Sequence, residues 1–128
     1  MIKTFKDLEA YKKAHALVLD VYKRTKQFPS EEKFGLVNQM RRCAVSITSN
    51  IAEGFSRGTS KDKVQFYTIA LGSLRELESQ MLISKDLDFL NPENCLGYAD
   101  QIELVSKLIS GLIKSASSRT FPQNLRSP

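Results

Sequence analysis

Apolar residues recur along the chain at steps of three and four, which is the spacing of one face of an α-helix. Four such stripes follow one another, and no alternation of period two competes with them. The pattern therefore predicts an all-α protein. The stripes are Leu8, Tyr11, His15, Val18 and Tyr22; Leu36, Met40, Cys43, Ile47, Asn50 and Gly54; Tyr67, Leu71, Leu74, Glu78 and Met81; and Tyr98, Ile102, Val105, Ile109, Leu112 and Ala116.

Turn and capping residues separate the four stripes into four helices. Proline cannot continue a helix, serine and asparagine accept hydrogen bonds from the first free N–H groups, and glycine lets the chain leave a helix in a left-handed conformation. The expected boundary residues are Pro29 and Ser30 after the first helix, Gly54 and Gly58 after the second, Ser60 before the third, and Asn91 with Pro92 before the fourth.

The lengths of these helices and of their connections predict the architecture. Helices of about 20 to 28 residues would each be about 30 to 40 Å long. Short connections force successive helices to run antiparallel, and similar lengths let four helices close on one core. We expect an antiparallel up-down-up-down four-helix bundle over residues 1–118. Residues 119–128 contain two prolines and no periodicity, and we expect them to form a flexible tail.

Length and composition place the chain in a broad class. A chain of 128 residues is the size of one domain, and 41% hydrophobic with 26% charged residues describes a soluble globular protein. No apolar run approaches the roughly 18 residues of a membrane span, and the first 14 residues lack the apolar segment of a signal peptide. We therefore expect a cytoplasmic protein that does not enter a membrane.

The net charge of +5 is unevenly distributed. Residues 1–29 hold seven Lys/Arg against three acids, whereas residues 59–90 hold four against five. This excess favours a polyanionic partner such as nucleic acid, although a solvated face or an ion pair between subunits would use the same residues. Our candidates for phosphate contact lie on the second helix and in the turn after it: Arg41, Arg42, Arg57, Lys61 and Lys63.

Three polar residues occupy apolar stripes: His15, Asn50 and Glu78. A buried carboxylate is costly unless donors satisfy it, so we expect Glu78 to bond to Asn50, His15, a tyrosine hydroxyl or an arginine. The favoured interpretation is a buried polar layer that fixes the register of the helices. The alternative, an acid-base centre, lacks a nucleophile and an open cleft, so we expect no enzymatic activity.

No metal, cofactor or small-molecule substrate is expected. Cys43 and Cys95 are far apart and outside any CxxC pattern, and the chain has a single histidine. The E-x-x-H pairs of di-iron bundles are absent. In "GFSRGTSK" the glycines are one residue closer than in a phosphate-binding loop, and the segment follows a helix instead of a strand.

The second helix has further apolar residues opposite its stripe. Val45 and Ala52 form a strip of small residues there, which suggests close packing against another copy of the chain. They are our candidates for an oligomer interface.

Several runs resemble one known family. They are "FKDLEAYKKAHALVLDVYKRTKQFPSEEKFGLVNQMRRCAVSITSNIAEGFSR" and "FYTIALGSLRELESQMLISKDLDFL". The most specific parts are "FPSEEKFGL", the "RR" pair, "NIAEG" and "ALGSLRELE". Between Phe5 and Ser115 the chain resembles the four-helix bundle proteins of the 23S rRNA-intervening sequence protein family. Thr48 stands where the family usually has proline.

The resemblance implies an antiparallel up-down bundle that assembles as a homopentamer and has no established enzymatic activity. Some members are encoded within insertions of the large ribosomal RNA gene. A more distant similarity joins the family to the accessory variability protein of diversity-generating retroelements, a basic pentameric bundle that binds nucleic acid and reverse transcriptase. We expect a non-enzymatic oligomer that binds RNA or scaffolds a nucleoprotein through exposed basic residues. The alternative is a protein–protein interaction module without a nucleic-acid ligand.

Overall fold

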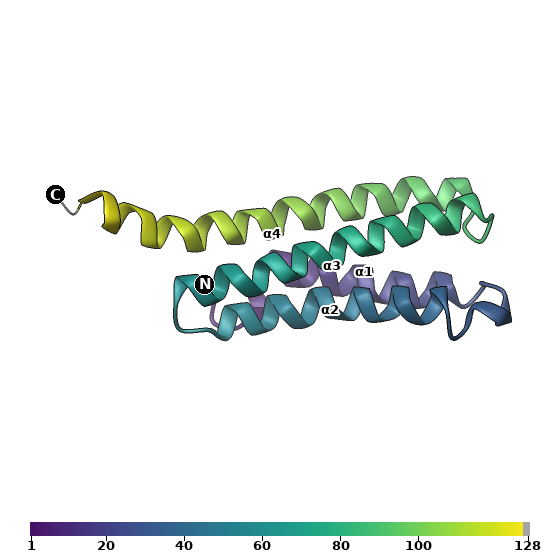
Figure 1. The fold of residues 1–128 in the computed structure, drawn as a ribbon, viewed down its shortest axis with the longest axis horizontal. Coiled ribbons are helices and arrows are strands. Elements are labelled where there is room, and N and C mark those ends of the chain that lie inside the picture. Colours follow the sequence, from purple (N-terminus) through teal and green to yellow (C-terminus); the bar gives the residue numbers. More distant parts are fainter. Residues whose placement is uncertain (127–128) are drawn as a thin grey trace.

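The computed structural model describes residues 1–126, with the side chains at 94, 96 and 119–126 left out of the description. Four long helices lie side by side, and successive helices run in opposite directions (Figure 1). Packing joins α1 to α2, α2 to α3, α3 to α4 and α4 back to α1, so the predicted all-α up-down-up-down bundle is confirmed. The elements are η1 (Phe5–Asp7), α1 (Glu9–Thr25), η2 (Ser30–Glu32), α2 (Leu36–Ser56), α3 (Ser60–Asp86) and α4 (Pro92–Arg126).

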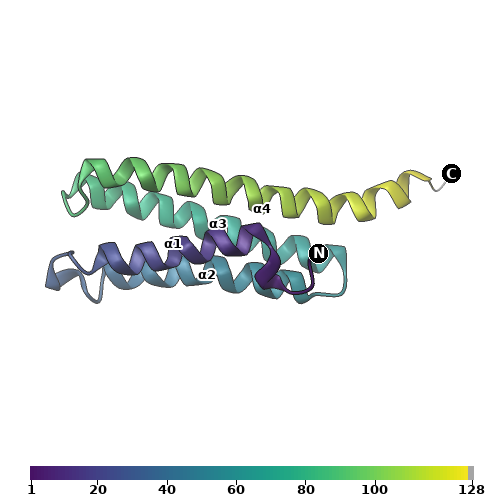
Figure 2. The same cartoon turned by 180° about the vertical axis from the view of Figure 1, so that it is seen from behind.

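The helices differ in length more than the sequence pattern predicts. The shortest, α1, has 17 residues, whereas α4 has 35 and is about 52 Å long at 1.5 Å per residue. The C-terminal part of α4 extends past the other helices at the end of the bundle where the N-terminus lies (Figures 1 and 2). Position 118 is therefore not a break in the helix. Flexibility of residues 119–128 stays a prediction, and residues 127–128 lie outside the described range.

Capping residues explain where two of the helices begin. Asn91 starts α4 as predicted, because its Oδ1 accepts a hydrogen bond from the backbone N–H two residues later at 3.0 Å. The cap of α3 is Thr59, one residue before the predicted Ser60. The predicted helix start at Ser30 is only a short 3-10 turn, and α2 begins at Leu36.

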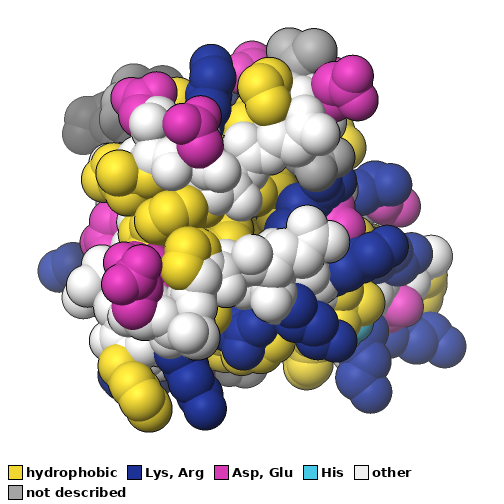
Figure 3. Space-filling view, turned by 90° about the vertical axis from the view of Figure 1, so that its right-hand side faces the viewer, with side chains coloured by type: hydrophobic (Ala, Val, Ile, Leu, Met, Phe, Trp, Pro, Cys, Tyr) yellow, Lys and Arg dark blue, Asp and Glu magenta, His cyan; other side chains and the backbone are white. Residues whose placement is uncertain are grey.

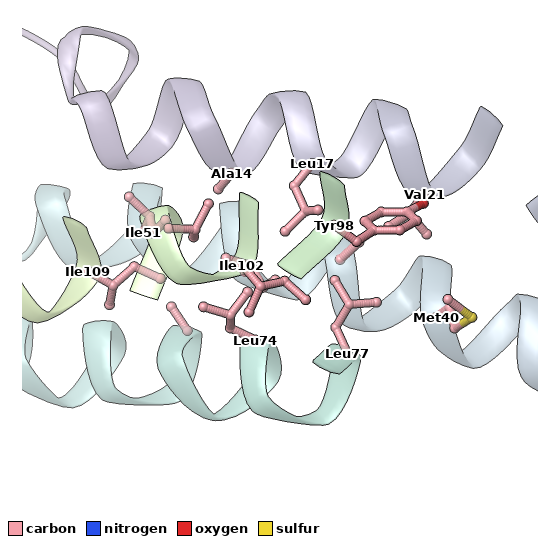
Figure 4. Packing of buried hydrophobic residues seen from close by; sticks show 14 of the residues in the cluster. Ala14, Leu17, Val21, Met40, Ile51, Leu74, Leu77, Tyr98, Ile102 and Ile109 are labelled. Atoms are coloured by element: carbon pink, nitrogen blue, oxygen red, sulfur yellow. The ribbon is translucent and has the colours of Figure 1, made fainter. Parts of the chain in front are cut away.

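The core lies between all four helices, and its side chains converge from each of them (Figure 4). On α4 the predicted stripe is confirmed, with only Leu112 partly exposed. On the other three helices the core is shifted by one residue at several positions. The buried core residues are Ala10, Ala14, Leu17 and Val21 on α1; Val37, Met40, Ala44, Ile47, Ile51 and Gly54 on α2; and Tyr67, Ala70, Leu74, Leu77, Met81 and Ser84 on α3.

Small residues account for this shift. Ala14, Ala44 and Ala70 are fully buried, whereas the larger neighbours His15, Cys43 and Leu71 lie beside the core or outside it. Alanine at a core position lets neighbouring helices approach closely, and close packing of backbones leaves few voids. The stripes predicted from large apolar residues on α1, α2 and α3 therefore lie beside the faces that contact the core.

Gly54 lies at a point of close contact between α2 and α3. A Cβ atom there would lie 2.7 Å from Cε1 of Tyr67 and 3.2 Å from Cβ of Phe66. Gly54 is fully inside α2, and no glycine in the described residues has a positive φ, so the predicted left-handed exit at Gly54 and Gly58 is wrong. The glycine is required for space instead of for backbone conformation.

Replacing Gly54 with alanine should destabilise the bundle. The added methyl would overlap the Tyr67 ring, and overpacking of this kind costs about 1 to 3 kcal/mol. Gly72→Ala is a matched control, because Gly72 is an exposed helical glycine of α3 where an added Cβ atom would meet no other element within 4 Å. The control should stabilise the protein by up to about 1 kcal/mol. Urea unfolding followed by circular dichroism measures both, and equal effects of the two substitutions would contradict this account.

Candidate nucleic-acid interface

The predicted buried polar layer does not form within the single chain. His15 is exposed, and the side chain of Glu78 is 44% exposed and pairs at 3.0 Å with Arg75 on its own helix. Asn50 is half-buried, and its Nδ2 donates to the backbone oxygen of Ser46 at 2.8 Å. Glu78 does bond to an arginine, but at the surface. The prediction of burial is wrong because the adjacent apolar residue takes the core position beside each of the three.

Polar contacts lie instead along the seam between α2 and α3. The hydroxyls of Ser46 and Ser73 are 2.9 Å apart. The thiol of Cys43 donates to Oε2 of Glu76 at 3.4 Å and accepts from Nε2 of Gln80 at 3.4 Å. Burial raises the pKa of the Cys43 thiol, so the reactive thiolate is scarce at neutral pH. This seam orients two helices and offers no activated nucleophile.

Two of the five basic candidates, Arg41 and Lys63, donate hydrogen bonds to oxygen atoms of another helix. Nε of Arg41 donates to Oγ1 of Thr25 at 2.9 Å, which ties α2 to the end of α1. Nζ of Lys63 donates to the backbone oxygen of Phe55 at 2.6 Å and to that of Gly54 at 3.4 Å. The carbonyl groups at the end of a helix attract a cation, so Lys63 stabilises the C-terminus of α2.

The five candidates do not form one basic corner. Arg57 pairs with Glu53 at 3.3 Å and lies 4.5 Å from the centre of the Phe66 ring. Arg42 and Lys61 are exposed. Fifteen residues of helix separate Arg42 from Arg57, which corresponds to about 22 Å. The structure therefore places Arg41 and Arg42 near one end of the bundle and Arg57, Lys61 and Lys63 at the other end of α2, so the five candidates do not form one site.

The larger concentration of positive charge lies on α1. We call the exposed residues Lys12, Lys13, Lys23 and Lys26 the α1 basic face. Lys12 makes an exposed ion pair with Glu9 at 3.9 Å. This face was not among the predicted contact residues, which all came from the second helix and the turn after it. The excess of seven Lys/Arg over three acids in residues 1–29 does mark it in the sequence.

The excess of positive charge extends from α1 to the layer that α1 and α2 form together. Residues 1–57, which form α1 and α2, hold eleven Lys/Arg against six Asp/Glu, whereas residues 58–126, which form α3 and α4, hold eight against eight. Among the Lys and Arg side chains visible in the end view, most lie toward the right-hand and lower side of the molecule (Figure 3). The layer of α1 and α2 is therefore the positive side, and the layer of α3 and α4 has no net charge.

The oligomer candidates lie on the outer side of α2. Val45 is 40% exposed and Ala52 is half-buried, and neither belongs to the buried core. Their contact with another copy of the chain stays a prediction.

One hollow, of about 440 Å³, is lined by Lys63, Tyr67 and mostly apolar residues, with no His, Cys, Asp or Glu among its lining residues. Another, of about 380 Å³, is lined by Glu78, Lys85 and Cys95 among mostly apolar residues. Within the described residues, no cluster of three or more His, Cys, Asp or Glu could hold a metal ion. Over the same part of the chain, no helix combines the length and the apolar character needed to cross a bilayer.

Removing the charge of Glu78 should have little effect on stability. Its ion pair with Arg75 is solvent-exposed, and such pairs contribute about 0 to 1 kcal/mol, so Glu78→Gln should cost no more than that. The neighbouring Leu77→Ala should cost about 2 to 5 kcal/mol, because Leu77 is fully buried. Chemical denaturation compares the two variants. A loss of several kcal/mol for Glu78→Gln would mean that the Glu78 carboxylate is buried, which contradicts this account.

Comparison with known proteins places the chain. No curated protein matches it significantly. Among solved structures, a protein of unknown function from the S23 ribosomal protein family of Bacteroides thetaiotaomicron superposes with a TM-score of 0.75 and 19% identity, over 82% of this chain and 95% of that one. At this identity the similarity concerns the fold. The family model for the 23S rRNA-intervening sequence protein matches residues 6–111. The chain therefore belongs to the 23S rRNA-intervening sequence protein family.

Proposed function

We propose that this protein is a non-enzymatic, oligomeric RNA-binding bundle that contacts phosphates through the layer of α1 and α2. The observation that carries the proposal is the excess of positive charge in that layer, with the lysines of the α1 basic face exposed to solvent. Lysines arranged along a helix neutralise phosphates without reading bases. The expected binding is therefore strong at low salt and weakly dependent on sequence.

Exposed aromatic rings favour RNA with unpaired bases over a regular duplex. Phe34, in the connection between α1 and α2, is 87% exposed, and Nζ of Lys33 lies 5.5 Å from the centre of its ring. Tyr22 is also exposed and carries Arg41 over its ring at 4.7 Å. A solvent-exposed ring beside a cation offers a stacking surface for an unpaired base and a partner for its phosphate.

Self-association would strengthen this binding. Each chain presents a modest basic surface, and several copies around one assembly would act multivalently on one RNA. The exposed Val45 and the small Ala52 on the outer side of α2 supply a surface for such contact. We propose a homo-oligomer, with five subunits by family resemblance. The two free cysteines fit a reducing compartment, and we place the protein in the cytoplasm.

A protein partner is the second candidate function. Leu82, Ile83 and Leu87 are exposed near the C-terminal end of α3, on the layer that carries little positive charge. Clustered apolar side chains of this kind are typical of protein contacts. In this case the bundle would join a protein on one layer, and RNA binding would not be required.

Neutralising lysines of α1 should weaken RNA binding and reduce its salt dependence. In a Lys12→Gln, Lys13→Gln, Lys26→Gln variant, the slope of log affinity against log salt should fall by up to about three units, since each lost phosphate contact removes about one. Fluorescence anisotropy with a labelled RNA hairpin across a salt series measures the slope.

The control variant carries Lys85→Gln, Lys107→Gln and Lys114→Gln on α3 and α4. It loses the same charge, and each set includes one lysine from an exposed ion pair, Lys12 with Glu9 and Lys107 with Glu103. The control should keep most of the affinity and slope. Equal losses in both variants would mean that only net charge matters, and absence of binding by the unmodified protein would favour the protein partner.

A charge at Val45 should weaken self-association. Light scattering of the unmodified protein should give a mass several times that of one chain, and Val45→Glu should shift it toward the monomer, because a carboxylate would be buried in the interface. Ile69→Glu is the control, since Ile69 is similarly exposed but belongs to α3. A stable monomer of the unmodified protein at high concentration would contradict the proposal.

A further inference from the structure

A polar pocket lies at the end of the bundle where α1 meets the connection between α3 and α4. It encloses about 340 Å³. It is lined by Asp20, Lys23 and Arg24 of α1, by Gln27 in the turn after this helix, and by residues 89–91 of the connection. It is continuous with the α1 basic face, because Lys23 belongs to both. A volume of this size accommodates a small polar ligand.

Arg24 is the central group of this pocket. Its guanidinium carbon lies 4.6 Å from the centre of the ring of Tyr98, a fully buried residue whose hydroxyl donates to the backbone oxygen of Asp20 at 3.2 Å. The guanidinium is therefore held in a defined position on a rigid aromatic surface. Stacking of this kind fixes the orientation of an arginine and reduces the entropy lost when it binds an anion.

One hydrogen-bond donor of this guanidinium has no acceptor in the described part of the chain. Nε of Arg24 is out of contact with solvent and has no hydrogen-bond partner in the described residues. None of the ion pairs among those residues includes Arg24. The carboxylate of Asp20, four residues earlier, is bound to α4 instead, because its Oδ2 accepts a hydrogen bond from Nε2 of Gln101 at 2.8 Å. Arg24 is only partly buried, so an anion in the pocket would meet the accessible part of its guanidinium and interact favourably with the charge.

We propose that this pocket binds a phosphate group of RNA, with Arg24 as the anchoring residue and Lys23 as a second cation. The proposal rests on the RNA-binding function proposed above and identifies phosphate as the group that this pocket binds. The planar guanidinium matches two phosphate oxygens, and Lys23 supplies further charge. The second carboxylate oxygen of Asp20 and the amide of Gln27 would then face the ribose, where Asp20 can accept from a 2′-hydroxyl.

The phosphate could come from an RNA end or from the backbone within a strand. These two sources differ in charge and in whether the strand continues past the pocket. An eight-nucleotide RNA with a 5′-phosphate and the same RNA with a 5′-hydroxyl distinguish them. Preference for the phosphorylated strand assigns the pocket to the end, and equal affinity that still depends on Arg24 assigns it to the backbone.

The test needs two measurements on the full chain. The first follows the Nε–Hε resonance of Arg24 in the unmodified protein by NMR during titration with AMP, with adenosine as the control that lacks phosphate. We expect AMP to shift this resonance and adenosine to leave it in place. The second compares RNA affinity between Arg24→Gln and Arg75→Gln, which removes an equal charge from an exposed position on α3, outside the layer proposed to contact RNA. Arg24→Gln should weaken binding about tenfold or more, since hydrogen bonds to charged groups are strong.

The outcomes separate this proposal from the proposed function. If the protein binds RNA in a salt-dependent manner while the Arg24 resonance stays in place and the two arginine variants bind alike, the pocket proposal is overturned and RNA binding stands. If AMP shifts the resonance but no RNA binds, the phosphate pocket stands and the RNA-binding function fails. The resonance is read in the unmodified protein, so a folding defect of Arg24→Gln would leave the test intact.

Discussion

Close approach of the helix backbones is the constraint on which the rest of this structure depends. Ala14, Ala44 and Ala70 are fully buried, and Gly54 leaves no room for a Cβ beside the ring of Tyr67. Small residues at these positions bring the helices together along a defined line, and this line determines which side chains are inside. Large residues such as Leu17 and Leu74 then fill the space that remains.

The position of this line explains why the polar residues of the stripes are not buried. Glu78 lies one residue after Leu77 and Asn50 one residue before Ile51, and one residue is a rotation of about 100° on a helix. That rotation moves each polar group from the core to its edge, where Glu78 meets Arg75 in solvent and Asn50 bonds within its own helix. The bundle therefore needs no buried charge for its stability, and the polar contacts along the α2–α3 seam orient the helices at lower cost.

The same up-down topology arranges charge. Because the chain folds in sequence order, the basic first half forms one layer and the more acidic second half forms the other, and a gradient along the sequence becomes a difference between two faces. The pocket around Arg24 lies where the positive layer meets the start of α4. Tyr98, from the second layer, holds the guanidinium of a residue from the first, so this feature exists only where the two layers join.

The sequence by itself determined the all-α class, the order and direction of four helices, the α4 stripe, the Asn91 cap and the family. These follow from local patterns: periodicity, capping residues and short connections. Only the tertiary structure decided which face of α1, α2 and α3 is inside, because alanine and glycine give little signal in a pattern of apolar residues. It likewise decided that Arg41 and Lys63 form structural contacts and that Arg24 meets Tyr98. Contacts between residues distant in sequence depend on how the helices rotate against one another, and that rotation is fixed by packing.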